Sequence, residues 1–295
     1  MLADYHVHSE FSDDSRYPME QVCEDAIRHS IDEICFTDHV DYGAKPDWET
    51  WREDPSCASV HINPKGIEEP VLNVDYDRYF PKIGEMRERF TALGDGRNLG
   101  GLSIKAGLEL GVQSHTITQS QALVNRWEST MDFAILSIHQ VGDQEFWTGD
   151  FQRDRTQAQY NMAYYEEMLN VVENYHDYSV LGHLDLIKRY DPAGIYPFEE
   201  TRDITAEILK RVIADGKGIE VNTSSFRYGL PDLQPCTEIL KLYRDLGGRI
   251  ITIGSDSHKP EHLGAYIGLV RKRLAALGFT EFCTFDAWEP RFHHL

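Results

Sequence analysis

Histidine, aspartate and glutamate residues end many of the short apolar runs in this sequence. The first run closes with His6 and His8 on either side of a valine. Side chains two apart on a strand point the same way, so these two imidazoles can hold one cation together. Imidazole and carboxylate groups are ligands of zinc, manganese and iron. Later runs end in residues of the same kinds, namely His39, Glu109, His139, His183, Asp256 and His258.

Each of these residues also has a structural alternative, such as a hydrogen-bonded core histidine or an ion-paired glutamate. Glu109 most needs a partner, because an unpaired carboxylate between Leu108 and Leu110 is costly to bury. Six of the seven expected strands end with at least one His, Asp or Glu, and Asn222 ends the other. A polynuclear metal site explains these residues together, because the C-terminal ends of parallel strands meet at one edge of a barrel.

The elements that must position these residues follow a repeating pattern. Short apolar runs alternate with amphipathic helical segments along the chain, which predicts βα units and a parallel sheet. Seven repeats in 295 residues predict an α/β fold with a closed or nearly closed barrel, while periodicity alone leaves an open sheet as an alternative. We expect strands at residues 2–8, 33–39, 103–111, 133–141, 179–186, 218–223 and 249–255, and helices at 18–30, 76–93, 156–175, 199–215, 236–246 and 261–277.

The repeats run without a dividing linker, so we predict a single domain over residues 1–295. Residues 41–75 depart from the pattern, since Trp48, Trp51 and several prolines lie there in a polar stretch with no clear period. We therefore expect a loop insertion after the second strand. Loops of this length often serve as lids or binding loops. The sequence leaves the role of this one open.

The net charge of the chain limits the classes of partner that it is expected to bind. There are 29 Lys and Arg residues against 49 Asp and Glu residues, which gives a formal charge of −20 with histidine neutral. Proteins that coat nucleic acid or anionic membranes rely on a basic surface instead. No stretch approaches the ~20 apolar residues that span a bilayer, and the N-terminus lacks a basic region followed by an apolar one. We expect a cytoplasmic protein that binds neither nucleic acid nor membrane.

The order of the motifs resembles the polymerase and histidinol phosphatase (PHP) superfamily. His-x-His, Thr-Asp-His, a central Glu, two single histidines and a final Asp-x-His run in that order from His6 to His258. The resemblance covers essentially the whole chain. Within the superfamily, residues 182–190, 222–227 and 289–292 are similar to the branch of monofunctional histidinol-phosphate phosphatases.

This resemblance implies the PHP fold, a distorted (β/α)7 TIM-like barrel that holds three divalent metal ions. It leaves zinc, manganese and iron as alternatives. Asp14 stands six residues after His8, where many superfamily members have a histidine, and Asp13 is the less favoured alternative. The motif match implies nine ligands: His6, His8, Glu109 and Asp256 at the first metal, Asp14, His39 and His258 at the second, and Glu109 again, as a bridge, with His139 and His183 at the third.

The same resemblance implies hydrolysis of a small phosphate monoester, with L-histidinol phosphate the expected substrate, by a metal-activated hydroxide and without a covalent intermediate. Glu109 would take part in catalysis as the bridging carboxylate, and either Asp256 or His258 would share or relay the proton. The branch motifs place Arg189 and Arg227 where a guanidinium fork would anchor the phosphate. The cationic end of the substrate needs an acidic or aromatic wall, for which Glu10, Gln113 and the loop with Trp48 and Trp51 are candidates.

Several competing functions remain at this point. A PHP phosphatase acting on phosphotyrosine or nucleotides, or a PHP exonuclease, would share most of these motifs. An amidohydrolase-like metal hydrolase also begins with His-x-His, but it often has a lysine where this chain has Glu109, and it lacks the closing Asp256-x-His258. A non-catalytic metal-binding scaffold would be favoured by a missing ligand, and all nine positions are filled.

Overall fold

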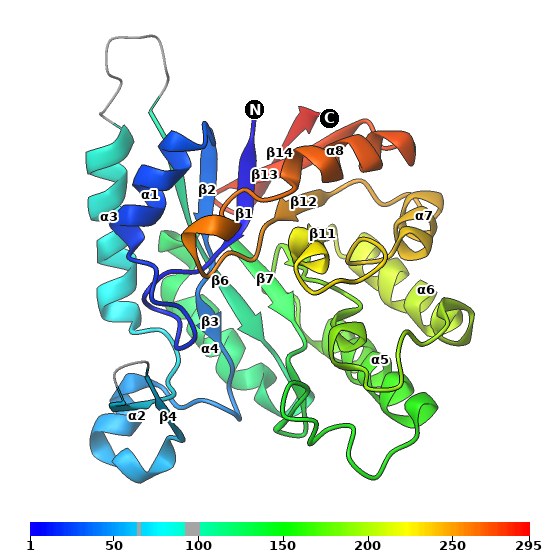
Figure 1. Cartoon of the computed structure of the whole chain (residues 1–295), viewed down its shortest axis with the longest axis horizontal. Coiled ribbons are helices and arrows are strands. Elements are labelled where there is room, and N and C mark those ends of the chain that lie inside the picture. The colour runs from blue at the N-terminus through cyan, green and yellow to red at the C-terminus, as the bar shows by residue number, and fades with distance from the viewer. Residues whose placement is uncertain (64–65, 92–100) are drawn as a thin grey trace.

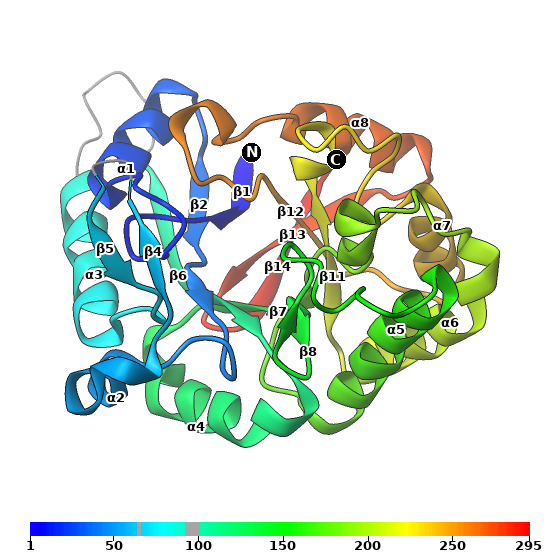
Figure 2. The ribbon, with the colours of Figure 1, turned by 60° about the horizontal axis from the view of Figure 1, so that its bottom comes forward.

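The computed structural model describes residues 1–63, 66–91 and 101–295. Among these residues, the central sheet has seven parallel strands in the order β1-β2-β6-β7-β10-β11-β12, and a short eighth strand pairs in parallel with β6. Val7 and Ser257 pair in parallel, which brings the first strand beside the end of the last and nearly closes the barrel (Figures 1 and 2). The α/β barrel is therefore confirmed. The strands are β1 (Ala3–Val7), β2 (Glu33–Phe36), β6 (Ser103–Gly111), β7 (Phe133–Ser137), β10 (Val180–Leu181), β11 (Gly218–Asn222) and β12 (Ile251–Gly254).

Helices form an outer layer around the sheet, as Figure 2 shows. Each turns an apolar stripe inward, as α7 does with the buried side chains of Ile239, Leu240 and Tyr243. A helix at 117–127 was not expected from the sequence, and residues 92–93 of the helix expected at 76–93 lie outside the described residues. The helices are α1 (Met19–Arg28), α3 (Tyr76–Thr91), α4 (Ile117–Trp127), α5 (Gln157–Asn174), α6 (Phe198–Ala214), α7 (Thr237–Asp245) and α8 (Ile267–Ala276).

The strand expected at 33–39 is broken in two. After β2 ends at Phe36, the short strand β3 (His39–Val40) pairs with β6, and His39 lies opposite Glu109. The break occurs because Asp38 turns inward, where its carboxylate accepts hydrogen bonds from the backbone and hydroxyl of Ser9 and from Ser12. These bonds fix the loop that follows β1 against the end of β2.

The strand expected at 179–186 is also shorter. β10 ends at Leu181, and the chain continues into a 3₁₀ helix, η4 (Leu186–Tyr190). Gly182 follows β10 at a close approach, since a Cβ atom there would lie 2.5 Å from Ile135 Cγ2 and 2.9 Å from Ser137 Oγ. The expected strand at 133–141 ends at Ser137 as β7, and β8 (Gln140–Val141) then pairs with β9 (Gln144–Glu145) in a small hairpin.

The insertion expected at 41–75 lies near the edge toward which the β6 and β7 arrows point in Figure 1. It holds α2 (Trp48–Glu53) and a hairpin of β4 (Val60–Ile62) and β5 (Glu68–Pro70), while residues 64–65 lie outside the described part of the chain. Asn73 links the two ends of the insertion, because its side chain accepts a hydrogen bond from the Asp41 amide and donates one to Lys45 O. The two ends of the insertion are thus tied together beside the C-terminal ends of the strands.

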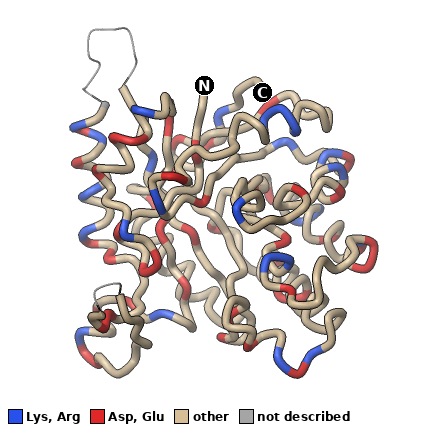
Figure 3. The backbone as a smooth tube through the Cα atoms, in the orientation of Figure 1, with Lys and Arg blue, Asp and Glu red and all other residues tan. Residues whose placement is uncertain are grey.

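A C-terminal hairpin covers the opposite end of the barrel. It consists of β13 (Glu281–Asp286) and β14 (Glu289–His294), and the Phe285 ring packs against Tyr5 and Phe133. Acidic and basic residues are intermixed along the backbone (Figure 3). Among the helices described, none is both long and apolar enough to span a bilayer.

Candidate metal centre

The nine expected metal ligands converge at the C-terminal edge of the barrel. They come from β1, β3 and β6 and from the segments that follow β1, β7, β10 and β12. Eight of the side chains are largely or fully buried, whereas that of Asp14 is 53% exposed. The structure therefore brings together His6, His8, Asp14, His39, Glu109, His139, His183, Asp256 and His258.

Glu109 lies at the middle of this cluster. Its two carboxylate oxygens face different groups of histidines, which is the arrangement a bridging carboxylate requires. Oε1 lies 2.7 Å from His183 Nε2 and 3.1 Å from His139 Nε2, while Oε2 lies 3.0 Å from His6 Nε2, 3.1 Å from His39 Nδ1 and 3.4 Å from His8 Nε2.

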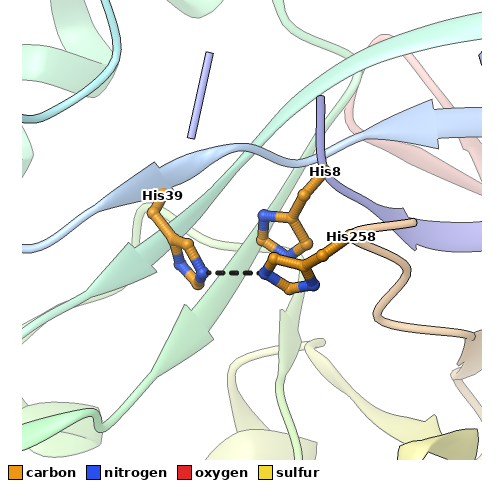
Figure 4. Close-up of side chains that lie close together, drawn as sticks. All are labelled: His8, His39 and His258. Carbon is orange, nitrogen blue, oxygen red and sulfur yellow. Dashed lines mark hydrogen bonds between the residues drawn. The ribbon is translucent and has the colours of Figure 1, made fainter. Parts of the chain in front are cut away.

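A second group of imidazoles surrounds Asp14. His258 Nε2 lies 3.1 Å from Asp14 Oδ2 and 3.5 Å from His39 Nε2, and the His8 ring stacks on that of His258 at 3.9 Å (Figure 4). The neighbouring Asp13 pairs instead with Lys45, at 2.6 Å. Of the two aspartates that the sequence offered, Asp14 is therefore the one beside the histidines.

The donor atoms in this cluster suit divalent cations. The Nε2 atom of His8 is buried and makes no hydrogen bond with any described residue, although Glu109 and Asp256 oxygens lie 3.4 and 3.6 Å away. Within the described chain, several three-residue groups bring their ligand atoms within 4.8 Å of one another, among them His6, His8 and Glu109. Buried polar atoms grouped without hydrogen bonds are costly unless a cation joins them. Nitrogen and oxygen ligands without cysteine fit zinc, manganese or iron.

Carboxylates outside the expected set orient two of the histidines. His6 Nδ1 lies 2.5 Å from Glu220 Oε1, and His139 Nδ1 lies 2.7 Å from Asp41 Oδ1. A carboxylate on one ring nitrogen holds the imidazole with the other nitrogen free to bind metal. Sequence reasoning missed both residues. Glu220 lies in the apolar run of β11 and could have been found by the burial argument that singled out Glu109.

Burial and the mutual charges shift the pKa values of the cluster in opposite directions. Burial raises the pKa of Glu109, but His6, His139 and His39 outweigh it and hold that pKa well below its usual range. Burial lowers the pKa of His139, but the Glu109 and Asp41 carboxylates raise it to about 9. Burial, with His258 and His39 nearby, lowers the pKa of His8. At neutral pH the Glu109 carboxylate is thus ionised and able to bind a cation.

A cavity of about 300 Å³ adjoins the cluster. Its lining includes ligand residues of the cluster together with Lys45, Trp147, Arg189, Tyr190 and Tyr228. The Arg189 guanidinium stacks 4.1 Å above the Tyr228 ring, donates to Ser224 Oγ and Gln234 Oε1, and lies 3.5 Å from Asp256 Oδ2. A firmly held positive charge thus lies beside the cluster in the lining of a cavity of small-molecule size.

The other three residues expected to bind substrate do not line this cavity among the residues described. Arg227 donates to the backbone oxygens of Ser255 and Asp256, at 2.6 and 2.7 Å. Gln113 donates to Tyr42 O and accepts from the Asp143 amide. The Glu10 carboxylate accepts from the Met19 amide at the start of α1. These side chains brace the backbone because each finds a main-chain partner nearby.

Comparison with known proteins agrees with the barrel. Residues 4–224 match the PHP domain. The chain belongs to the PHP family. It is 30% identical to a histidinol-phosphatase of Lactococcus lactis over 96% of this chain and 94% of that protein, and 27% identical to a probable histidinol-phosphatase of Thermotoga maritima over 94% and 93%. Among solved structures, histidinol phosphate phosphatase from Lactococcus lactis, complexed with zinc, L-histidinol and phosphate, has a TM-score of 0.78 at 28% identity and covers 98% of both chains. The PHP fold expected from the sequence is thereby confirmed.

Proposed function

We propose that this PHP-family protein is a metal-dependent phosphatase that hydrolyses L-histidinol phosphate to L-histidinol and phosphate. The observation that carries the proposal is the buried cluster of histidines and carboxylates that lines a cavity of about 300 Å³ together with Arg189. Relatives named histidinol-phosphatase align with nearly the whole chain, and one of them has a structure with zinc, L-histidinol and phosphate. Family membership sets aside the amidohydrolase alternative.

The cluster would hold three divalent ions. When bound, such ions supply Lewis acidity, lower the pKa of water and neutralise the charge of the phosphoryl group. The proposed sets are His6, His8, Glu109 and Asp256 for the first ion, Asp14, His39 and His258 for the second, and Glu109, His139 and His183 for the third.

Arg189 would bind the phosphoryl oxygens. Its guanidinium is always charged, and stacking on Tyr228 and hydrogen bonds to Ser224 and Gln234 fix its orientation. A guanidinium fork fixed in this way matches the oxygens of a phosphate.

Asp256 would share the proton released in hydrolysis. Its Oδ1 faces His6 and His8 at 3.7 and 3.6 Å, while its Oδ2 faces Arg189. Burial raises the pKa of Asp256, but His6, Arg189 and His258 hold it far below its usual range, so the carboxylate is ionised. His258 Nδ1 lies 3.6 Å from Asp256 Oδ1 and 3.1 Å from the Asp256 carbonyl oxygen, so this imidazole would orient Asp256.

The aromatic side of the cavity suits the leaving alcohol. Trp147, Tyr190 and Tyr228 lie on that side, and aromatic rings contact a planar imidazole favourably. A phosphate ester of an imidazole-bearing alcohol would therefore find groups suited to both of its halves in the same lining.

A substrate comparison tests the proposal. Protein loaded with zinc, manganese or iron is assayed on histidinol phosphate, p-nitrophenyl phosphate, phosphotyrosine and a nucleoside monophosphate, with metal content measured in parallel. Histidinol phosphate should have the highest kcat/KM. A higher value for phosphotyrosine or the nucleotide would overturn this substrate and favour another PHP phosphatase. The cytoplasmic location and the lack of nucleic-acid binding stay predictions.

A further inference from the structure

Lys45, a residue of the insertion, reaches the wall of the catalytic cavity. Its side chain is 7% exposed, and its ammonium lies 2.6 Å from Asp13 Oδ1 and 2.9 Å from Asp41 Oδ2. It also lines the cavity together with the cluster. Burying an ammonium between two carboxylates is favourable only where the geometry is close, as it is here.

The two carboxylates lead to different parts of the proposed metal centre. Asp41 uses its other oxygen to hold His139 Nδ1 at 2.7 Å. Asp13 directly precedes Asp14 in the chain, and the Asp14 carboxylate lies 3.1 Å from His258 Nε2. One ammonium therefore joins the residue that orients His139 to the loop that carries Asp14.

The insertion holds this ammonium in place through its backbone. The Lys45 amide donates to Asp41 O at 2.8 Å, and Asn73 donates to Lys45 O at 3.0 Å. Asn73 also accepts from the Asp41 amide and is itself buried. Because Asn73 lies at the far end of the insertion, closure of its base fixes where the Lys45 side chain starts.

Removing the ammonium would leave two carboxylates without their cation. The side chains of Asp41 and Asp13 are 2% and 15% exposed, so neither is fully solvated where it lies. A buried carboxylate without a partner turns toward another cation or toward water. The Asp41 oxygen that faced Lys45 would then turn to water or another cation and rotate the carboxylate against His139, and the loss of the contact with Asp13 would release the loop that carries Asp14.

We propose that Lys45 is a positioning residue through which the 41–75 insertion sets the geometry of the metal centre. It holds Asp41 against His139 and the Asp13–Asp14 loop against His258. This inference rests on the metal site of the proposed function and does not depend on which phosphate ester is hydrolysed.

Zinc retention by Lys45→Met tests the inference. The protein is loaded with zinc and dialysed against a series of chelator concentrations, and zinc per chain is then measured. Loss of a residue that orients metal ligands weakens metal binding about 10–100-fold. We expect Lys45→Met to lose zinc at correspondingly lower chelator, and Lys45→Arg, which keeps the charge and several donors, to regain part of the loss.

Lys105→Met is the matched control. Its ammonium lies 2.7 Å from Asp286, its side chain is 15% exposed, and it stands near the start of β6, away from Glu109 near the end of that strand. The same substitution there should lower thermal stability and leave zinc retention at the wild-type level. Equal zinc loss in both variants would show a general effect of losing a lysine ion pair and would overturn the inference.

A folded Lys45→Met protein that keeps zinc as wild type does would also overturn it. Should Lys45→Met fail to fold, Asp13→Asn separates the same contact without removing the lysine. Asp13→Asn is expected to lose zinc about 10-fold more readily, and wild-type retention would refute the link to the Asp14 loop. Because zinc is measured without substrate, failure of the histidinol phosphate assay leaves these results interpretable.

Discussion

Replacing Arg227 by methionine should release metal from the protein. Arg227 donates from Nη1 to Ser255 O at 2.6 Å and from Nη2 to Asp256 O at 2.7 Å. Asp256, a proposed metal ligand, has a φ of 56°, in the left-handed region that residues other than glycine rarely occupy. The guanidinium thus holds the backbone of a strained residue whose side chain faces the histidines.

The magnitudes favour this interpretation. Holding an aspartate in the left-handed region costs of order 1–3 kcal/mol. A hydrogen bond to a charged group contributes roughly 1.5–3 kcal/mol, so the two from Arg227 together offset that cost. Methionine fills a similar volume but donates nothing. The turn at Asp256 would then relax, and its carboxylate would leave His6 and His8, which lie 3.7 and 3.6 Å from Asp256 Oδ1.

The assay pairs zinc content with steady-state kinetics. Arg227→Met should lose zinc during chelator dialysis, with kcat falling as the metal is lost and recovering in excess zinc. Arg189→Met provides the contrast, because that side chain lines the cavity. There we expect wild-type zinc content, a raised KM and a kcat/KM lower by about 10–100-fold, which corresponds to one charged hydrogen bond to phosphate.

One outcome for Arg227→Met would refute the role of Arg227 in holding the Asp256 backbone. If Arg227→Met kept all its zinc while KM for histidinol phosphate rose, Arg227 would act on the substrate, as the family resemblance implies. The backbone-bracing argument for Asp256 would then be wrong.

Three further predictions concern the cluster. Glu109→Gln should deplete two of the three proposed metals at once, because its two oxygens face separate groups of histidines; elemental analysis showing an unaltered metal count would contradict the bridge. Glu220→Gln should weaken zinc retention about 10–100-fold, because Glu220 contacts His6, and a chelator titration checks this. KM should stay near the wild-type value, since Glu220 is not among the described residues that line the cavity. In the metal-free protein, burial lowers the pKa of His139, but Glu109 and Asp41 raise it from 6.5 to about 9. The protonated imidazole therefore contributes stability that is complete below about pH 6.5 and is lost as pH rises through about 9. Thermal melts of the metal-free protein should show Tm falling over that range, and a Tm that rises there would contradict the assignment.

Local sequence pattern predicted the barrel well where a strand depends on its own side chains. The strand expected at 103–111 is β6 (Ser103–Gly111), a long apolar run buried between neighbours. The same pattern failed where contacts with residues far away in the sequence decide at which residue a strand ends. β2 stops at Phe36 because Asp38 hydrogen-bonds to Ser9 and Ser12, which lie more than twenty residues away in the chain. Periodicity within a short window does not include such partners.

The candidate site divides in the same way. The side chains of residues within strands, such as His6 and Glu109, point in directions that the strand itself sets, so their convergence could be predicted. Long side chains after the strands are different, because sequence gives their charge but not their direction. Arg189 turns into the cavity while Arg227 turns to the backbone, although both follow strands in similar motifs. Asp41 was missed since its role depends on His139, almost a hundred residues later.

The cavity also explains how an acidic chain with a formal charge of −20 could accept an anionic substrate. Among the described residues, its lining has five carboxylates and two permanent cations, Lys45 and Arg189, which gives a formal charge of −3 with histidine neutral. In the metal-free protein, protonation of His139, whose pKa burial lowers but Glu109 and Asp41 raise to about 9, offsets part of that negative charge. Three divalent ions, with their histidine ligands neutral, would change the charge to +3 and attract a phosphate dianion. Metal loading is therefore a condition for binding the substrate as well as for the chemistry, and residues such as Lys45 that hold the ligands in place act on both.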